Sequence, residues 1–359
     1  MENPIWGPMN MLLIRRKNSV ILLISLLCMC ILMPRDVKAQ NSFRIISYNV
    51  ENLFDCWNDS LINDEGFLPN SMRGWTYKRY QQKLVAISKV IAAMGEWDTP
   101  LLVGLCEVEN RSCLKDLCTK GGLKAYGYDI IHYDSPDRRG IDVALMFDKN
   151  AFTLLASEAV KVGAVAEKPF VARDILYAKG IVAQRDTLHV FMCHFPSRWS
   201  GMYETQHLRM EAAGVLRHKV DSITTRNPHA LIVIMGDFND EPFDKSMAQT
   251  LDARPVGPTI EKQALYNLMR LPENQQQGTH YYQGQWNCFD QIIVSGALLT
   301  GEAQLRVAQS TAHVFKPDFL LIEDEKELQQ RPWRTYNGMK YWGGFSDHLP
   351  VYVDLEVKQ

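Results

Sequence analysis

The stretch ALIVIMGDFN, residues 230–239, joins an apolar run to a group of polar residues. Ala230 to Met235 is apolar throughout, as in a strand that is covered on both faces. Asp237 and Asn239 follow within four residues, where burial gives no reason for an acid and an amide. Ordinary turn chemistry would also use these two residue types. The stretch therefore predicts a buried strand whose carboxyl end carries either a turn or part of a functional site.

Several other apolar runs stop at, or begin with, a polar residue in the same way. Taken singly, each such residue has a structural explanation, such as a turn asparagine, a first-turn helix acid or a core histidine. Taken together, they predict polar side chains along one rim of a rigid scaffold, which is where sites tend to be built. The polar residues in question are Asn49, Glu107, His194, Asp237, Asn239, Asp290, and Asp347-His348 before the last apolar run.

The remaining pattern predicts the fold class. Apolar spacing of three to four residues indicates helices at 76–94, 111–120 and 203–225. Strand-like runs cover 43–50, 101–106, 128–133, 141–147, 175–183, 187–193, 230–235, 289–294 and 351–357. Loops are expected at 55–74 and 318–341. Many strands with few helices and mostly short connections predict an α+β protein with two sheets packed face to face and helices outside.

The N-terminus has the character of a secretory signal peptide. Arg15, Arg16 and Lys17 precede an apolar run from Val20 to Met33, which is short for a bilayer span. We expect cleavage near Ala39, leaving residues 40–359 as one domain in the periplasm or outside the cell. A membrane anchor, or a lipid attached at Cys28 or Cys30, is the alternative reading of the same segment.

Charge and cysteine content exclude some classes of protein. Residues 1–39 carry five basic and two acidic residues, so their removal would change the formal net charge from −2 to −5. No basic run suggests an extended grip on a nucleic-acid backbone. The six cysteines that remain form no Cys-x-x-Cys pair, which argues against a structural zinc site. Their pairing is left open.

The motifs together resemble those of the endonuclease/exonuclease/phosphatase superfamily, whose members include deoxyribonuclease-I-like nucleases. The matching pieces occur in the family's order and cover about residues 43–357. They are SYNVEN (47–52), GLCEV (104–108), RGIDVA (139–144), HF (194–195), GDFND (236–240), FDQI (289–292) and SDHLPV (346–351). The resemblance implies a four-layered α/β sandwich of two mainly antiparallel sheets flanked by helices. It also implies a divalent metal, usually Mg²⁺, with Mn²⁺ or Ca²⁺ as alternatives.

Phosphoryl transfer needs a hard cation, an aligned water and donors for the developing charge. We expect Glu107 to be the first metal ligand, with Asn49 and Asp347 nearby, because magnesium prefers oxygen ligands. We expect Asp237 to orient or deprotonate the attacking water, and Asn239 to hydrogen-bond the phosphoryl group. His348 would be oriented by Asp290, and the sequence leaves open whether it acts as a base or as a cationic phosphate donor. His194 would contact a non-bridging oxygen or assist the leaving group, and Arg139 would act as a phosphate clamp. Arg138 is the alternative clamp because it is adjacent.

The substrate remains open at the level of sequence. The chain looks most like exported bacterial nuclease-like members, so a metal-dependent phosphodiesterase or nuclease that acts as a monomer, possibly on nucleic acid, is the first hypothesis. A phosphomonoesterase on sugar or inositol phosphates is the second, and a sphingomyelinase-like phospholipase is the third. A binding module without catalysis is disfavoured because each expected polar position holds a competent residue. Aromatic residues at 333, 336, 341 and 342 could pack within their loop, contact lipid or stack on bases.

Overall fold

The computed structural model describes residues 42–96, 98–163, 170–271, 277–324 and 329–358. The expected signal peptide, residues 1–39, lies outside these described residues. Within them, none of the helices combines the length and apolar character that crossing a bilayer requires.

The first large sheet contains both ends of the described chain. Its strand order is β14-β20-β1-β2-β4-β3, and β15 also pairs with β20. All neighbours are antiparallel except β1 and β2. The strands are β1 (Ser42–Leu53), β2 (Leu102–Val108), β3 (Asp129–His132), β4 (Asp142–Phe147), β14 (Leu305–Val307), β15 (His313–Val314) and β20 (Val351–Val357).

The second large sheet has the order β5-β6-β7-β8-β13-β10-β9. Its parallel neighbours are β7 with β8 and β9 with β10, and the other pairs are antiparallel. The strands are β5 (Phe152–Val160), β6 (Ile175–Val182), β7 (Asp186–His194), β8 (Leu231–Asp237), β9 (Ala253–Arg254), β10 (Leu265–Asn267) and β13 (Asp290–Ser295).

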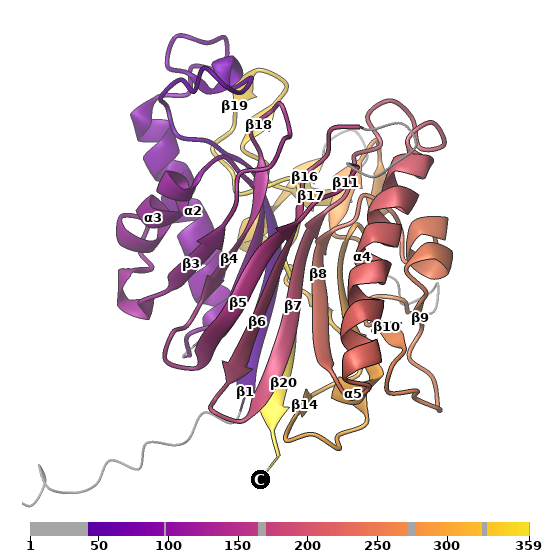
Figure 1. Cartoon of the computed structure of the whole chain (residues 1–359). Coiled ribbons are helices and arrows are strands. Elements are labelled where there is room, and N and C mark those ends of the chain that lie inside the picture. Colours follow the sequence, from indigo (N-terminus) through magenta and orange to yellow (C-terminus); the bar gives the residue numbers. More distant parts are fainter. Residues whose placement is uncertain (1–41, 97, 164–169, 272–276, 325–328, 359) are drawn as a thin grey trace, which may run out of the picture. The chain divides into compact units, whose positions relative to one another are not determined.

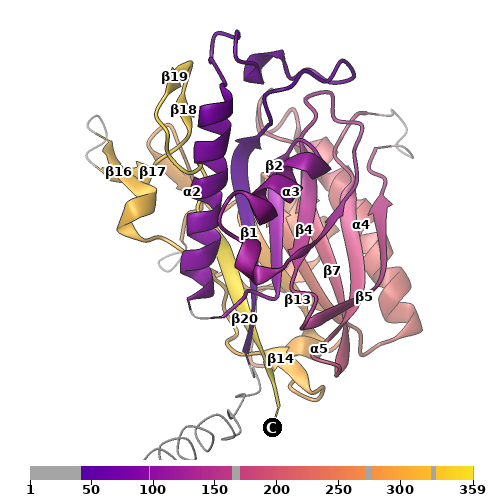
Figure 2. The ribbon, with the colours of Figure 1, turned by 90° about the vertical axis from the view of Figure 1, so that its left-hand side faces the viewer.

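Figures 1 and 2 show the layers of the fold, and three apolar clusters hold these four layers together. The first fills the space between the sheets, where Leu145 and Val353 share a cluster with Val190 and Met235. The second lies under α2 (Tyr77–Gly95) and α3 (Arg111–Thr119), on the outer face of the β1 sheet. The third lies under α4 (Gln206–Arg226), on the outer face of the β8 sheet. The predicted four-layered sandwich is confirmed.

The predicted elements are largely confirmed, and the differences have physical causes. The strand β5 was missed because it is a sheet edge whose side chains are mostly exposed, so it lacks an apolar pattern. The helix α4 begins at Gln206 rather than at residue 203, because residues 202–205 form a turn. Residues 318–341 form two short hairpins rather than an irregular loop: β16 (Leu321–Asp324) with β17 (Gln329–Pro332), and β18 (Tyr336–Asn337) with β19 (Lys340–Tyr341).

The aromatic residues of this late segment pack within the protein. Tyr336 is buried and its ring lies 6.0 Å from that of Trp75, while Trp333 lies 5.9 Å from Phe345. The loop-packing interpretation therefore describes them better than lipid contact or base stacking. Six cysteines of the described residues are buried, namely Cys56, Cys106, Cys113, Cys118, Cys193 and Cys288.

Candidate active site

Strand register brings three of the polar residues into one row. The parallel pairing of β7 with β8 places His194 beside Asp237. The antiparallel pairing of β8 with β13 places Asp290 on the other side of Asp237. Three strand ends that are far apart in sequence therefore meet at one rim of the second sheet.

Asp237 is buried at the centre of this row, and its carboxylate accepts hydrogen bonds from residues of both sheets. Its Oδ2 accepts a hydrogen bond of 3.0 Å from Nδ2 of Asn49, which belongs to β1 of the opposite sheet. The Nε2 atoms of His194 and His348 lie 3.5 and 3.7 Å from the same oxygen. Its Oδ1 accepts from the backbone N–H of Asn239 at 2.9 Å. The carboxylate is thus fixed at the place where donors converge.

His348 is oriented by Asp290, as the sequence predicts. Its Nδ1 lies 2.7 Å from Oδ2 of Asp290, and both residues are buried. Burial disfavours the cation, but the Asp290 and Asp237 carboxylates outweigh it and raise the pKa of His348 well above its ordinary value. Ser346 holds the turn, because its hydroxyl donates to the Asn49 carbonyl at 2.7 Å and accepts from the His348 N–H at 3.1 Å.

His194 is in the opposite charge state. Burial, followed by the nearby Arg173 and Arg139 cations, lowers the pKa of His194 well below its ordinary value. Its Nδ1 is buried with no hydrogen-bond partner among the described residues. At neutral pH the site therefore pairs a neutral imidazole with a cationic one, and such separated pKa values assign different roles to similar groups.

The candidate metal ligands lie on the β1 sheet, next to this row. Glu107 interrupts β2 at a bulge with φ of 66°, and one carboxylate oxygen accepts from the backbone N–H of Asn52 at 2.9 Å. Strained backbone of this kind is common at functional sites. Burial and the charge of Asp347 raise the pKa of Glu107. Each of these two carboxylates is half-buried and keeps one oxygen without a hydrogen-bond partner among the described residues, so both offer hard oxygen ligands to solvent.

These donors fit a magnesium-like ion, which needs only one or two carboxylates and keeps several waters. Asn49 is less free to bind it, because its oxygen accepts from the Glu51 N–H at 3.0 Å and its amide donates to Asp237. Among the described residues, tighter groups of potential ligands occur elsewhere. They are Asp55 with Glu109 and Cys113, and His132 with Asp134 and Asp142.

A buried charge network behind the ligands was not predicted from sequence. Arg334 donates to Asp347 at 2.8 Å and to Glu51 at 3.1 Å. Lys83 of α2 is buried and donates to the Thr335 hydroxyl and the Phe345 carbonyl. Burial lowers the pKa of Lys83 to about 8. The network fixes Asp347 from behind, and a lysine on the apolar face of a predicted helix was the only sequence signal for it.

His280 is a second addition to the site. It belongs to β11 (His280–Tyr282), which forms a hairpin with β12 (Gln285–Asn287). Its ring centroid lies 4.5 Å from that of His348. Burial, followed by the charge of His348, lowers the pKa of His280 to about 4. The adjacent Thr279 hydroxyl accepts from the Asp290 N–H at 3.0 Å, so the hairpin supports both members of the His–Asp pair.

The arginines of the site are held by Asp137. Arg139 is half-exposed and lies 3.3 Å from the Asp137 carboxylate, and its charge contributes to the electrostatics of Glu107 and His194. Arg173 was not predicted from the sequence. Its side chain is buried, forms an ion pair of 2.7 Å with Asp137, and donates hydrogen bonds to the backbone carbonyls of His194 and Phe195. An Arg-Asp pair that opens an apolar strand at residues 173–174 was the available signal.

Asn239 lies at the edge of the site, with φ of 50°. Its side-chain amide donates to the Phe195 carbonyl at 3.1 Å. The structure thus brings Asn49, Glu107, His194, Asp237, Asn239, Asp290, Asp347 and His348 to one rim, with Arg139 on a neighbouring loop.

Solved structures with the same architecture come from several organisms. An endonuclease/exonuclease/phosphatase from Bacteroides vulgatus has a TM-score of 0.53 and 17% identity, covering 89% of this chain and 100% of that chain. The human Nocturnin catalytic domain has a TM-score of 0.53 and 15% identity, covering 88% and 95%. Humanized D. rerio TDP2 has a TM-score of 0.52 and 17% identity, covering 88% and 99%. These likenesses show the fold.

A search among curated proteins finds no match. The family model for the endonuclease/exonuclease/phosphatase family matches residues 44–357, nearly the whole of the described chain. The chain therefore belongs to the endonuclease/exonuclease/phosphatase family and is a metal-dependent phosphoester hydrolase.

Proposed function

We propose that this chain is an exported phosphodiesterase of the nuclease type that uses Mg²⁺. The observation that carries the proposal is the convergence of Asn49, His194 and His348 on the Asp237 carboxylate, beside the half-buried Glu107. Export rests on the sequence of residues 1–39 alone. The metal identity rests on the oxygen donors of Glu107 and Asp347.

Each residue then has a defined task. Glu107 and Asp347 would hold the ion, which supplies charge stabilisation to the phosphoryl oxygens when bound. Asp237 would accept a hydrogen bond from the attacking water and take its proton. His348, kept cationic by Asp290, would donate to a non-bridging oxygen, and His194 and Asn239 would contact the same group.

The charge balance favours a diester over a monoester. A phosphomonoester carries more negative charge than a diester at neutral pH and needs more unpaired cations. In the described part of the chain, Arg139 and Arg173 pair with Asp137, and Arg334 pairs with Glu51 and Asp347. The cations around the site are thus already largely balanced. A phosphomonoester is therefore the less favoured substrate.

Exposed aromatic rings near the site favour nucleic acid as the alcohol part of the substrate. Trp199 is 95% exposed and follows His194 by five residues. Tyr282 is 59% exposed and stacks on His280, which in turn contacts His348. Aromatic rings bind unpaired bases by stacking. Among similar structures, D. rerio TDP2 was solved with a single-strand DNA product, with a TM-score of 0.51 and 16% identity.

The hydrolysis of bis-p-nitrophenyl phosphate tests the chemistry. Activity should be lost in EDTA and return on addition of MgCl₂, with MnCl₂ and CaCl₂ as comparisons. The substitution His348→Ala should reduce the rate by about 10²-fold or more, the range for a positioned acid or base. Full activity in chelator would rule out the metal-dependent mechanism.

A substrate panel tests the class. It comprises single-stranded and duplex DNA, RNA, inositol phosphates and sphingomyelin vesicles. We expect single-stranded DNA or RNA to be cleaved most rapidly. Preferential hydrolysis of inositol phosphates or of sphingomyelin would replace the nuclease proposal with one of its alternatives, while leaving the metal-dependent chemistry intact.

A further inference from the structure

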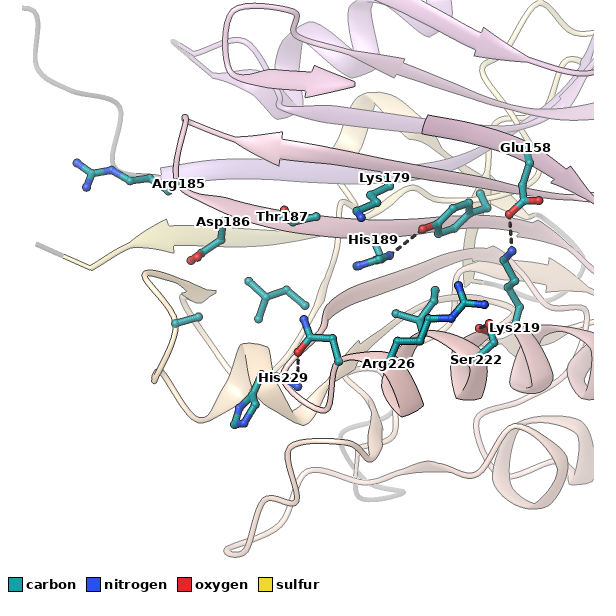
Figure 3. Close-up of a pocket in the computed structure, with 15 residues that line it drawn as sticks. Glu158, Lys179, Arg185, Asp186, Thr187, His189, Lys219, Ser222, Arg226 and His229 are labelled. Atoms are coloured by element: carbon teal, nitrogen blue, oxygen red, sulfur yellow. Dashed lines mark hydrogen bonds and ion pairs between the residues drawn. The ribbon is translucent and has the colours of Figure 1, made fainter. Parts of the chain in front are cut away.

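A cavity of about 710 Å³ lies far from the catalytic rim, between the outer face of the second sheet and the end of α4 (Figure 3). It is lined by the beginning of β7, whereas His194 ends that strand. Five residues separate His189 from His194 along the strand, which corresponds to roughly 17 Å. None of the catalytic residues lines it. Its volume falls within the range of about 300–1,000 Å³ that is usual for small-molecule sites.

The strand pattern explains why the cavity exists. Alternate residues of β7 face α4, and they change character along the strand. Phe191 and Cys193 are buried in the apolar cluster under the helix, whereas Thr187 and His189 line the cavity. On β6, Lys179 is paired in register with His189. The apolar part of this sheet face therefore ends at Phe191, and the side chains nearer the beginning of β7 are polar.

Donors dominate this lining. Lys179 and Arg226 have no ion pair or hydrogen bond among the described residues. Lys219 forms an ion pair with the Glu158 carboxylate, and its Nζ lies 5.2 Å from the centroid of the Tyr177 ring. Arg185 and Asp186 complete the charged lining, so four cations face two carboxylates. The cavity has an excess of two positive charges on a chain whose formal net charge is −2.

His189 adds a directed donor. Its Nδ1 lies 2.8 Å from the Tyr177 hydroxyl. Burial and the neighbouring Lys179 lower the pKa of His189 to about 4, so the ring is neutral. A neutral phenol can donate to Nδ1, and in that tautomer the ring proton resides on Nε2. The Nε2 atom has no hydrogen-bond partner among the described residues, and His189 lines the cavity.

We propose that this cavity is a binding site for a small phosphorylated anion, held by Lys179, Arg226 and the Nε2–H of His189. Ammonium, guanidinium and imidazole N–H groups are the donors that bind phosphate oxygens. The site is independent of the proposed catalytic function, since it shares no residue with it.

Calorimetric titration of the full chain with inorganic pyrophosphate, in EDTA and at low salt, tests the proposal. We expect saturable binding, weaker binding of inorganic phosphate, and binding of glucose 6-phosphate if the occupant is a phosphorylated metabolite rather than a free phosphate. Lys179→Ala and Arg226→Ala should each weaken pyrophosphate binding by about tenfold, the usual worth of a hydrogen bond to a charged group.

Matched controls separate this site from others. Lys149→Ala and Arg111→Ala remove exposed cations that have no partner among the described residues, and should leave binding unchanged. His348→Ala should also leave it unchanged. Arg226→Gln provides a second variant if Arg226→Ala unfolds below the temperature of the titration.

Three results would overturn the proposal. The first is no binding at millimolar pyrophosphate. The second is binding that His348→Ala abolishes, which would move the anion to the catalytic rim. The third is a short oligonucleotide that binds through Lys179 and Arg226 more tightly than pyrophosphate, which would identify a surface for a polymer instead.

Discussion

At the catalytic rim two buried carboxylates lie side by side and serve different partners. Asp290 is fully buried and contacts His348 at 2.7 Å, while Asp237 receives Asn49 and the backbone of Asn239. Two buried negative charges on directly paired residues of neighbouring strands would destabilise the fold unless a cation lay between them. The imidazolium of His348 meets this requirement, because its two nitrogens face the two carboxylates.

The substitution Asp290→Asn should therefore impair catalysis more than folding. An amide keeps the volume but does not hold the His348 cation, so we expect the rate on bis-p-nitrophenyl phosphate to fall by about 10²–10⁴-fold. Asp148→Asn is the matched control. Asp148 is also buried, but it directly follows the last residue of β4 and is not one of the residues of the catalytic rim. An Asp290→Asn rate within a fewfold of the unmodified chain would remove Asp290 from the mechanism.

The exposed aromatic residues should affect substrate choice rather than chemistry. Trp199→Ala removes a ring that is 95% exposed, so it should not alter the hydrolysis of bis-p-nitrophenyl phosphate. With a single-stranded oligonucleotide we expect KM to rise by about tenfold, because stacking contributes roughly 1–3 kcal/mol per base. The matched control is Leu61→Ala, an exposed residue without a ring. Equal KM values for Trp199→Ala and the unmodified chain would contradict base stacking at this position.

The residues predicted from sequence and those that were missed differ in a physical way. Glu107, His194 and Asp237 interrupt or end apolar runs, so each breaks a pattern that is visible locally. His280 lies in a segment without such a pattern, and its relevance depends on a contact across the fold. Arg173 precedes an apolar strand, but only its contacts with the end of β7 show that it belongs to the site. Arg334 became part of the site only because a hairpin brings it to Glu51, which is 283 positions away.

At the level of elements, α2 does more than cover the first sheet. Its Thr76 cap accepts from the Arg79 N–H, and its apolar face carries Leu84, Ile87 and Ile91 into the core. On the same face, Lys83 is buried and donates to Thr335 and Phe345. The helix thereby ties the network behind Asp347 to the sandwich.

Replacing this lysine tests that role. The charges of Lys83 and Arg334 both act on the buried Glu51 carboxylate. Lys83→Met keeps the length of the side chain but leaves Arg334 as the one cation beside Glu51 among the described residues. Because removing one partner of a buried charge is costly, we expect the free energy of unfolding to fall by about 3 kcal/mol. Urea denaturation provides the measurement, with Lys78→Met, an exposed site on the same helix, as the control. A loss no larger than that of Lys78→Met would show that the network contributes little.

The pH dependence of stability should reveal the environment of His189 in β7. Burial and Lys179 lower its folded pKa from 6.5 to about 4, while the unfolded chain keeps the ordinary value. The unfolded state therefore takes up the proton first as pH falls. The stability lost between pH 7 and pH 5 should be larger by about 2 kcal/mol in the unmodified chain than in His189→Asn, which cannot titrate. Parallel stability curves for the two proteins would contradict this prediction.

In the described domain, glycine permits one close contact between the two sheets and another between neighbouring strands of the second sheet. A Cβ built on Gly104 would lie 2.4 Å from Sδ of Met192 and 2.7 Å from Cε of Met235, both from the opposite sheet. A Cβ on Gly236 would lie 1.9 Å from the Cys193 carbonyl, and its φ is 145°. The first contact is with flexible side chains and the second is with backbone.

Two alanine substitutions should consequently differ in severity. Gly104→Ala should lower the free energy of unfolding by about 1–3 kcal/mol, the usual cost of overpacking. Gly236→Ala should cost more and reduce soluble protein, because neither the backbone angle nor the carbonyl can yield easily. Thermal and urea unfolding would measure both, with Gly257→Ala, in open space, as the control. Equal losses at positions 104 and 236 would contradict the argument.

The sequence by itself determined the layered α+β architecture and most residues of the rim, because strand and helix periodicity and the polar ends of apolar runs are local properties. Tertiary structure alone decided which charges meet. The register of β7, β8 and β13 assigns His194 and Asp290 to Asp237, and the late hairpins bring Arg334 to Asp347. It also decided where α4 stops covering the second sheet and leaves a cationic cavity. These features depend on distances between segments far apart in the chain, which no local pattern encodes.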